Sequence, residues 1–371
     1  MQRTIPPFRY DFIGSFLRPQ YLKDARARFS AGAISAEELW AVEDRAIEEL
    51  VAKQQDAGYH GITDGEFRRS TWHLDFMWAF DGVGHRPTNT GLPFHDEAAL
   101  IDDTFLTGKI SIGVHPFVEH FSFLKGLERP GSVARQTIPA PAQFLEQMIM
   151  PMNAASTSAI YPDTEELIHD IAAGYRKVIA DLYAAGCRNI QFDDCSWGVC
   201  VDPNALLFFG TDEPGLLRVK EQLLRVNNLA LAGKPEDLVV TTHICRGNFH
   251  STWACRGGYD MVAGTLFGKE HVDAYYLEFD DERSGGFEPL HEVPGGKVVV
   301  LGLVTTKNPR LESKRAVIER IEQAAKIVPL DRLCLSPQCG FASCEIGNKL
   351  TEDEQWAKLA LVKEIAEEVW G

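Results

Sequence analysis

Residues 239–245 read VVTTHIC, a short run that begins apolar and ends in polar side chains with chemical potential. The same progression recurs in NIQFDD (189–194), AYYLEFDD (274–281), KVVVLGLVTT (297–306) and RLCLSPQC (332–339). A (β/α)8 barrel requires strands of this kind, because its active site is assembled from the carboxyl ends of the strands and the loops that follow them. The sequence therefore predicts an α/β fold, a TIM barrel, with its site at these strand ends.

Amphipathic segments alternate with these runs. Ser35 with Glu38, and Thr351 with Glu354, have the spacing of a capping box, which predicts helices near 36–57 and 351–369. Apolar residues at helical spacing predict a third helix over 164–185, which ends at Gly186. Two earlier segments, DFIGSF (11–16) and GYHGITDGEF (58–67), also begin apolar and end polar. They supply further expected strands.

Residues 80–135 do not follow the pattern. This stretch contains glycine, proline and histidine, and GKISIGV (108–114) reads as a pair of short strands. We expect it to be an insertion that lies over the barrel mouth. Because the chain shows no internal repeat, low-complexity tract or linker, we expect residues 1–371 to form a single domain.

Composition excludes several classes of function. The chain has 371 residues, with 37 Lys and Arg against 53 Asp and Glu, so its formal net charge is −16. A negative field without a basic run disfavours nucleic acid and anionic membrane surfaces as partners. No stretch approaches the roughly 20 apolar residues that span a bilayer, and the first residues lack the apolar core of a signal peptide. We expect a cytoplasmic protein.

Eight cysteines are too few for a disulfide framework in a chain of this length. Six of them lack the spacing of metal ligands and are expected to be packing residues: Cys187, Cys195, Cys200, Cys255, Cys334 and Cys344. The other two, Cys245 and Cys339, follow expected strands. Only these two are candidates for chemistry.

The strongest chemical signal is His243 with Cys245. Residues i and i+2 share one face of a strand, so both side chains point the same way at the strand end. An imidazole and a thiolate are ligands that Zn²⁺ prefers, and Glu278 and Cys339 stand at the ends of later strands. The alternative reading is a buried His–Cys pair, with Glu278 as a helix cap and Cys339 as a core residue. Barrel closure would instead bring all four together as a metal site.

These motifs resemble the cobalamin-independent methionine synthase family. The resemblance covers nearly the whole chain and is closer to a short, single-barrel branch with the motifs GSFLRP (14–19), TDGEFRR (63–69), HICRGNF (243–249) and LSPQCGFAS (335–343). It implies a zinc-dependent methyltransferase of methionine biosynthesis, with His243, Cys245, Glu278 and Cys339 as the zinc ligands. It implies homocysteine as the thiol substrate.

The resemblance also implies substrate-binding residues. Glu66 in the DGE motif and Asp193 in IQFDD would act as the catalytic pair that holds the α-ammonium group of homocysteine, and the loop Ile13-Gly14-Ser15 would take its carboxylate. We place Arg68 and Trp197 in the same substrate site. The alternative readings are structural: Asp193 or Asp194 caps a loop, and Glu66 pairs with Arg68 or Arg69.

Three differences from the family leave the methyl donor open. The chain is too short for the family's second, amino-terminal barrel, and Thr305 stands where the family has a histidine proposed to deliver a proton to the leaving group. The segment TIPAPAQF (137–144) replaces the family's donor-binding motif. The donor is therefore methyltetrahydrofolate or a simpler methyl compound, and His73 and His115 are candidates for the missing acid.

Two further readings remain. One is an alkyltransferase for another thiol such as coenzyme M, since epoxyalkane:coenzyme M transferases resemble the same family. The other is a non-catalytic barrel in which zinc only stabilises the fold. Coenzyme M has a sulfonate and no amino group, so two carboxylates at Glu66 and Asp193 favour an amino-acid thiol. The sequence leaves the oligomeric state open, and we list a homodimer as one possibility.

Overall fold

A parallel β-sheet forms the centre of the computed structural model, which describes residues 3–88 and 90–371. Six strands are hydrogen-bonded in the order β7-β8-β9-β10-β11-β12, so each strand lies beside its neighbour in sequence. Their bounds are β7 Gln136–Pro139, β8 Asn189–Asp194, β9 Val239–Ile244, β10 Ala274–Glu278, β11 Val298–Val304 and β12 Leu333–Pro337. A separate parallel pair joins β1 (Gly61–Ile62) to β6 (Val133–Ala134), which precedes β7 by one residue.

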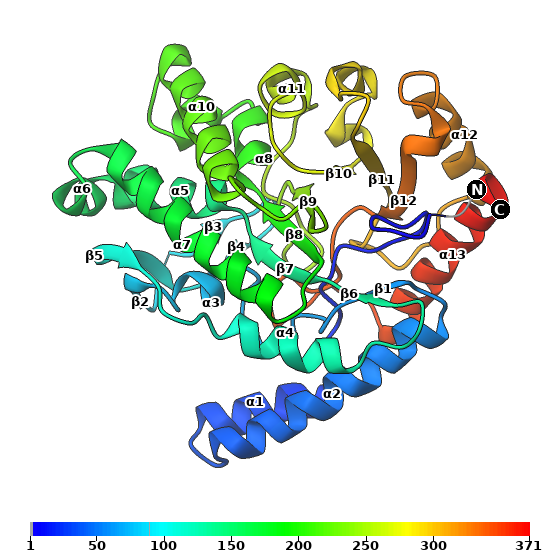
Figure 1. Cartoon of the computed structure of the whole chain (residues 1–371), viewed down its shortest axis with the longest axis horizontal. Coiled ribbons are helices and arrows are strands. Elements are labelled where there is room, and N and C mark those ends of the chain that lie inside the picture. The colour runs from blue at the N-terminus through cyan, green and yellow to red at the C-terminus, as the bar shows by residue number, and fades with distance from the viewer. Residues whose placement is uncertain (1–2, 89) are drawn as a thin grey trace.

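Helices surround these strands (Figure 1). The two predicted capping boxes are present, with the side chain of Ser35 or Thr351 accepting from the N3 amide and the N3 glutamate accepting in return. The α-helices are α1 Gln20–Ser30, α2 Ala36–Asp56, α3 Leu74–Met77, α4 Phe117–Gly126, α5 Pro141–Ile149, α6 Pro151–Ile160, α7 Thr164–Ala184, α8 Ser196–Val201, α9 Ala205–Phe208, α10 Glu213–Ala230, α11 Asp260–Leu266, α12 Lys314–Ala324 and α13 Glu352–Trp370. Short 3-10 turns occupy Glu282–Ser284, Glu288–Glu292 and Leu330–Arg332.

Both faces of the sheet are buried, which explains why its strands read as nearly continuous apolar runs. On β10, Tyr275 and Leu277 join the large core shared with the helices. Ala274 and Tyr276 belong to a separate inner cluster with Ile13 of the amino-terminal segment. The alternation of a strand therefore sends one set of side chains to the helices and the other set to the inside of the sheet.

The amino-terminal segment closes onto the last strand. Tyr10 forms a parallel bridge with Leu335, and the amide of Asp11 donates to the carbonyl of Leu335 at 3.0 Å. Inside the sheet, Asp11 accepts from the hydroxyl of Tyr276 at 2.7 Å and from the guanidinium of Arg135 at 3.1 Å. This buried network joins the first segment, β10 and the residue between β6 and β7.

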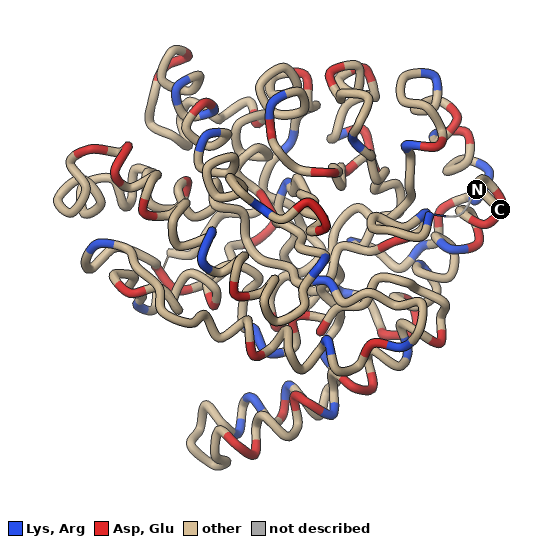
Figure 2. The backbone as a smooth tube through the Cα atoms, in the orientation of Figure 1, with Lys and Arg blue, Asp and Glu red and all other residues tan. Residues whose placement is uncertain are grey.

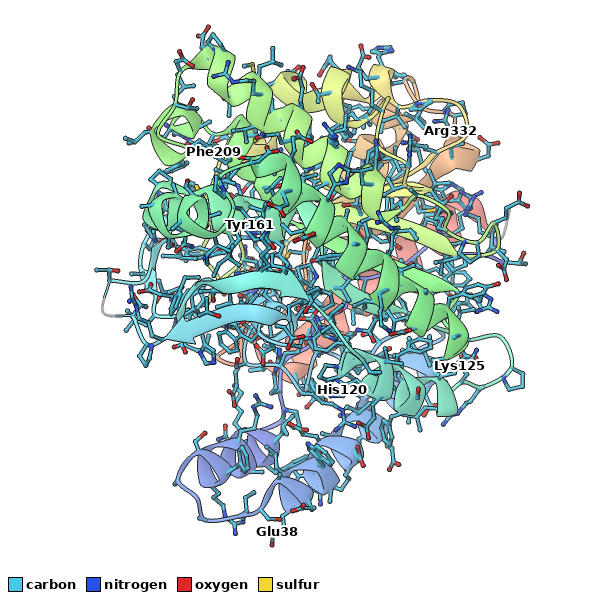
Figure 3. All side chains as sticks on the ribbon, turned by 60° about the vertical axis from the view of Figure 1, so that its left-hand side comes forward. Glu38, His120, Lys125, Tyr161, Phe209 and Arg332 are labelled. Atoms are coloured by element: carbon cyan, nitrogen blue, oxygen red, sulfur yellow. The ribbon has the colours of Figure 1, made fainter. Side chains whose placement is uncertain are left out.

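Within the predicted insertion, the described residues form the strands β2, β3, β4, β5 and β6 and the helix α4 (Phe117–Gly126). β2 (Asp81–Arg86) pairs antiparallel with β5 (Asp103–Ser111), and β3 (Leu92–Pro93) pairs antiparallel with β4 (Ala98–Ala99). The expectation that 108–114 forms two strands is wrong, because 108–111 is the end of the single long strand β5. Figure 3 shows this ribbon alongside α7, with the α1–α2 hairpin projecting from the body.

Acidic and basic residues are interspersed along the outer helices (Figure 2). Among residues 3–88 and 90–371, no helix combines the length and apolar character needed to cross a bilayer.

Candidate metal centre

Four buried side chains meet at the carboxyl ends of the strands. One ligand atom from each of them lies within 4.8 Å of the others: His243, Cys245, Glu278 and Cys339. His243 is on β9, Glu278 ends β10, and the two cysteines stand just past β9 and β12. The structure therefore brings together all four residues that the sequence pattern singled out.

Strand register explains the convergence. His243 lies opposite Tyr276 in the parallel pair of β9 and β10, and Cys245 and Glu278 each lie two residues further along their strands. Positions two apart share a face, so these side chains point to the inside of the sheet together with Tyr276. Cys339 reaches the same place from the loop after β12.

The unsatisfied atoms of this cluster fit a bound metal ion. The two sulfur atoms of Cys245 and Cys339 are 3.7 Å apart, and thiolates ~2.3 Å from a tetrahedral zinc lie about 3.8 Å apart. Nδ1 of His243 donates to the carbonyl of Tyr276 at 3.3 Å, which leaves Nε2 buried without a hydrogen-bond partner. Oε2 of Glu278 is buried and accepts no hydrogen bond, and the guanidinium groups of Arg246 and Arg283 lie 3.8 Å from it. Such orphaned atoms are costly unless a ligand satisfies them.

Electrostatics favour thiolate at this position. Hydrogen bonds from Cys195 and Cys339 lower the pKa of the Cys245 thiol well below its ordinary value. Burial opposes the charged form of His243, but Cys245, Asp193 and Glu278 together raise its pKa. The amide of Gly247 also donates to the sulfur of Cys245 at 3.3 Å. A deprotonated sulfur is the form that binds metals.

A second group of carboxyls lines the same cavity. Glu66 and Asp193 are both buried there, beside His243 and Cys245. Oε1 of Glu66 accepts from the hydroxyl of Thr137 at 2.9 Å and pairs with Arg69 at 3.3 Å, whereas Oε2 is buried without a partner. Oδ1 of Asp193 accepts from Nε2 of Gln191 at 2.8 Å. Each carboxyl is thus held by one oxygen only.

The backbone at Glu66 is strained in order to aim this side chain. Gly65 and Glu66 both have positive φ, 67° and 63°, and a glutamate rarely adopts that conformation. The amide of Glu66 donates to Oδ1 of Asp64 at 2.9 Å, which holds the turn. Conformations of this cost persist where the surroundings enforce them, and they cluster at functional sites.

Burial raises the pKa of Asp193 to about 7, and the neighbouring Glu66 adds to the shift. The pKa of Glu66 is raised by burial as well, against the lowering effect of Arg69 and Arg18. Two buried carboxyls that disfavour each other's ionisation form a site that a cation stabilises.

The loop after the first segment completes this side. Ile13 and Ser15 line the cavity, while Gly14 lies between them with its carbonyl accepting from the hydroxyl of Thr63 at 2.7 Å. A Cβ on Gly340 would lie 1.9 Å from Oγ of Ser15, so only glycine allows the loop that carries Cys339 to approach this segment.

Two of the proposed substrate-binding residues lie elsewhere. The guanidinium of Arg68 pairs with Glu43 and Asp44 of α2, and Arg68 does not line the cavity. Trp197 is fully buried on α8 and does not line it either. Both residues follow strand ends in sequence, but the first turn after each strand directs them into the surrounding helices.

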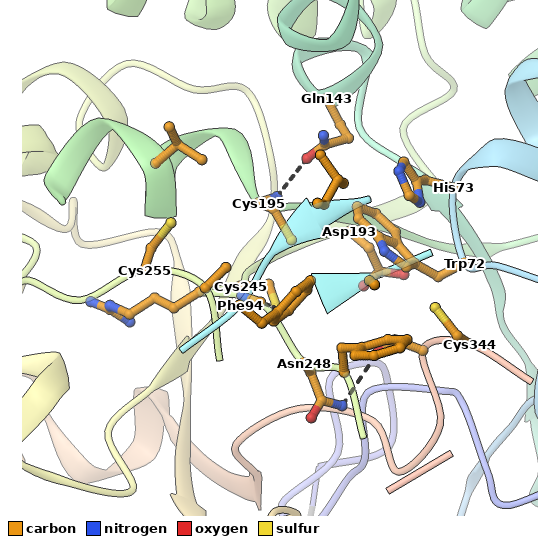
Figure 4. Close-up of a pocket in the computed structure, with 18 of the residues that line it drawn as sticks. Trp72, His73, Phe94, Gln143, Asp193, Cys195, Cys245, Asn248, Cys255 and Cys344 are labelled. Atoms are coloured by element: carbon orange, nitrogen blue, oxygen red, sulfur yellow. Dashed lines mark hydrogen bonds between the residues drawn. The ribbon is translucent and has the colours of Figure 1, made fainter. Parts of the chain in front are cut away.

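The cavity has a volume of about 270 Å³ and two unlike walls. We call the first the strand-end half, comprising Ile13, Ser15, Glu66, Asp193, His243, Cys245 and Cys339. We call the second the loop half, comprising Trp72, Phe94, Glu146, Met150, Phe208 and Phe249. Phe94 follows β3 of the insertion, and residues of this stretch line the cavity: Leu92, Pro93, Phe94, Ala99 and Ile101. Figure 4 shows Trp72, Phe94 and Asn248 around Cys245.

Sequence reasoning missed Cys195, Gln143 and Glu146. Cys195 was expected to be a packing residue, but it lines the cavity and its thiol hydrogen-bonds to Cys245. Its amide donates to Oε1 of Gln143 at 3.0 Å, and Nε2 of Gln143 donates to Oε2 of Glu146 at 2.8 Å. Burial and Asp194 raise the pKa of Glu146 to about 8. The sequence did offer one signal. Gln143 and Glu146 are three positions apart, so on a helix their side chains lie on the same face.

Neither candidate histidine is placed to deliver a proton as an imidazolium. His73 lines the cavity, but burial lowers its pKa to about 3, so it is neutral near pH 7. His115 is fully buried in the core, where it stacks on Phe76 at 4.3 Å and bonds its carbonyl. Thr305 does not line the cavity.

The chain was compared with known proteins. Residues 149–368 match the family model described as "Cobalamin-independent synthase, Catalytic domain". The uncharacterized protein YxjG of Bacillus subtilis is 43% identical over 100% of this chain and 97% of its own length. The solved structure of a putative vitamin-B12 independent methionine synthase from Listeria monocytogenes is 38% identical, with a TM-score of 0.77 and 99% of both chains covered.

A more distant relative is longer. The 5-methyltetrahydropteroyltriglutamate–homocysteine methyltransferase of Candida albicans is 24% identical over 96% of this chain but only 42% of its own length. The family model covers more than half of the chain, and relatives of equal length match it end to end. This chain therefore belongs to the cobalamin-independent methionine synthase family of methyltransferases.

Proposed function

We propose that this protein methylates the thiol of homocysteine to give methionine, using zinc held by His243, Cys245, Glu278 and Cys339. The observation that carries the proposal is one cavity that contains three of these ligands together with Glu66 and Asp193. A thiol-activating centre and a site for an α-ammonium group are then adjacent. The methyl donor is methyltetrahydrofolate or a simpler compound.

The residues divide the work as follows. Zinc bound at this site supplies the positive charge that keeps a coordinated thiol deprotonated near neutral pH. Oε2 of Glu66 and the carboxyl of Asp193 bind the α-ammonium of the amino-acid thiol, and the loop of Ile13, Gly14 and Ser15 receives its carboxylate. The cation relieves the mutual destabilisation of the two carboxyls, so binding favours their ionised forms. The substrate sulfur is thereby directed toward the metal ligands of the strand-end half, with the loop half beside it.

Coenzyme M is the weaker alternative. Among the described residues that line the cavity, Arg246 carries the only guanidinium or ammonium group. Its nitrogens donate to the carbonyl of Gly257 at 2.8 Å and 2.9 Å and to the hydroxyl of Tyr259 at 2.8 Å. A sulfonate would therefore meet two carboxyls and no available cation.

We also propose that residues 1–371 form one domain and that its strands close into a (β/α)8 barrel. Closure is supported by a hydrogen bond between the amino-terminal segment and the segment after β1: the amide of Phe16 donates to the carbonyl of Gly65 at 3.1 Å. The bridge from Tyr10 to β12 and the pairing of β1 with β6 supply the other two joins. A cytoplasmic location and a homodimer stay predictions from sequence.

The test is elemental analysis of the purified protein followed by X-ray absorption at the zinc edge with and without homocysteine. We expect one zinc per chain that gains a sulfur neighbour when homocysteine binds. A zinc site that keeps the same four protein ligands in saturating homocysteine would contradict thiol activation and favour a structural role. A preparation without zinc that still methylates homocysteine would contradict the metal assignment.

A further inference from the structure

The loop half of the cavity carries negative and apolar groups. Among the six residues that define this half, Glu146 is the one ionisable side chain, and its walls include the rings of Trp72, Phe94 and Phe249. The rings of Phe94 and Phe249 lie with their centroids 5.3 Å apart. Aromatic faces attract cations and repel anions. A carboxyl among aromatic rings therefore suits a small cation, and it is unsuited to a ligand with several carboxylates.

The size of the cavity points the same way. The whole space, strand-end half included, is about 270 Å³, whereas pockets for drug-sized ligands begin at about 300 Å³. An amino-acid thiol already occupies part of that volume. What is left beside the sulfur accommodates a compact group inside the cavity.

The acid-base groups supply the third observation. A neutral amine donor must gain a proton as it leaves, because an amide anion is a very poor leaving group. His73 is neutral near pH 7 and His243 belongs to the metal cluster, so Glu146, with its pKa raised to about 8, is the one acid that the loop half offers. A leaving group that is already neutral after losing its methyl group needs no proton at all.

We propose, resting on the proposed function, that the methyl donor is a small onium compound, a sulfonium or quaternary ammonium ion, bound in the loop half between Glu146 and the rings of Trp72, Phe94 and Phe249. For a sulfonium, the thiolate of the acceptor gives an electron pair to the methyl carbon. The bond from methyl to the sulfonium sulfur breaks, and that sulfur keeps the pair and leaves as a neutral sulfide. The proton of the acceptor thiol has already left to solvent, so charge and atoms balance.

Glu146 has the geometry for a counter-ion. Oε2 is held by Gln143, which is itself fixed by the amide of Cys195 next to the metal cluster. The other groups that face Glu146 are Asp194 behind the strand end and the thiols of Cys195, Cys200 and Cys255. Because none of these is a cation, a bound onium ion is the partner that ionises Glu146.

The experiment uses zinc-loaded protein, homocysteine and three methyl sources. Trimethylsulfonium tests the onium site, 5-methyltetrahydrofolate tests the amine donor, and methyl iodide tests thiol activation independently of any donor site. We expect trimethylsulfonium to be turned over at least 100-fold faster than 5-methyltetrahydrofolate. Calorimetry on the same protein with homocysteine absent is expected to detect binding of trimethylsulfonium.

Two variants and a control locate the binding. Glu146→Gln keeps the hydrogen bond to Gln143, and Phe94→Leu removes one ring. Each is expected to raise the Kd for trimethylsulfonium about tenfold. Glu322→Gln on α12 makes the same change of charge on the outer surface and is expected to leave the Kd unchanged.

The outcomes separate this proposal from the proposed function. Homocysteine that methyl iodide alkylates no faster with the protein than without it would overturn thiol activation, and the donor proposal with it. Accelerated alkylation by methyl iodide, without binding or turnover of trimethylsulfonium, would overturn the onium donor alone. Faster turnover of 5-methyltetrahydrofolate, lost in Glu146→Gln, would make Glu146 the proton donor to a leaving amine and would also overturn it.

Discussion

The two halves of the cavity are built from different parts of the fold. The strand-end half takes its side chains from strand termini and the first residues after them, where the parallel ladder fixes the backbone. The loop half takes Phe94 from the insertion, Glu146 and Met150 from α5 and its end, and Phe249 from the loop after β9. One half is polar and held by hydrogen bonds, and the other is largely apolar and held by packing.

This difference indicates which half determines the chemistry and which half determines the choice of donor. A buried metal site and a pair of carboxyls tolerate little displacement, because unsatisfied polar groups are costly. An apolar wall excludes water and accepts groups of similar size with smaller penalties. We therefore expect changes in the strand-end half to abolish chemistry and changes in the loop half to alter the choice and affinity of the donor.

Removing a metal ligand should have the largest effect. Cys245→Ala is expected to lower metal affinity at least 100-fold and methyl transfer about 1,000-fold, because the thiolate and its charge are both lost. Elemental analysis and the initial rate measure the two effects. Cys334→Ala removes a buried thiol from the middle of β12 instead. If that control lost zinc to the same extent, general destabilisation would be the cause.

Next in size is the ammonium site. Glu66→Gln is expected to lower kcat/KM for homocysteine about 30-fold, the value of a charged hydrogen bond in a buried site. The same variant should leave the reaction of 4-mercaptobutyrate nearly unchanged, since that thiol lacks the amino group. Equal losses with both thiols would contradict the assignment of Glu66 and indicate a structural role for its contact with Thr137.

The strand-end half could be read from the sequence because its signals are local. Apolar strands that end in polar residues mark which side chains reach the site, and the i, i+2 spacing of His243 and Cys245 fixes their common face. The structure brings these residues together with Glu278 and Cys339 as predicted. Helix bounds were predictable for the same reason, since the capping boxes at Ser35 and Thr351 depend on residues three positions apart.

The loop half depends on tertiary packing and was largely missed. The sequence predicts that residues 80–135 lie over the mouth, but nothing local to Phe94 indicates that this residue faces the cavity. The helix that carries Glu146 follows β7, a strand that the sequence analysis did not identify. Arg68 shows the reverse error: it follows the DGE motif by two residues, yet its side chain finds two carboxylates on α2. Sequence places a residue after a strand, and neighbouring elements decide where its side chain goes.

A smaller effect is expected from the insertion. Phe94→Ala removes an aromatic wall and its contact with Phe249, and we expect the KM for the methyl donor to rise about tenfold while zinc content stays at one per chain. Leu100→Ala, in the same insertion but 71% exposed, is the matched control and should leave KM unchanged. Loss of zinc in Phe94→Ala would show that the metal site in the strand-end half depends on the packing of the loop half.

The smallest expected effect concerns the buried network behind the strand-end half. Nδ2 of Asn227 donates to Oε1 of Glu270 at 2.7 Å and to Asp194 at 3.3 Å, while Oδ1 of Asn227 accepts from the amide of Ala142. This network anchors the end of β8, next to Asp193, to α5 and α10. Burial raises the pKa of Glu270 to about 8, with Asp194 adding to the shift and Lys297 opposing it.

The sign of the resulting pH effect follows from linkage. An unfolded glutamate titrates near ~4.3, so between about pH 4.3 and 8 the folded state holds a proton that the unfolded state has lost. The contribution of Glu270 to stability is therefore complete below pH 4.3 and falls as pH rises toward 8. Glu270→Gln keeps the hydrogen-bond acceptor and removes the ionisation. We expect Glu270→Gln to be more stable than the parent at pH 8 and to change little at pH 4.5.

Urea unfolding at the two pH values measures this difference, and Glu236→Gln on an exposed loop controls for the change in net charge. A variant equally stable relative to the parent at both pH values would mean that Glu270 is ionised in the folded protein and held by Lys297. In that case the strand-end half would be supported by an ion pair between Glu270 and Lys297, and not by a hydrogen-bonded network with a neutral Glu270. The same network also holds the start of α5, the helix that carries Glu146, because Asn227 accepts from the amide of Ala142. Since Glu270→Gln keeps an acceptor for Asn227, donor affinity in this variant should equal that of the parent.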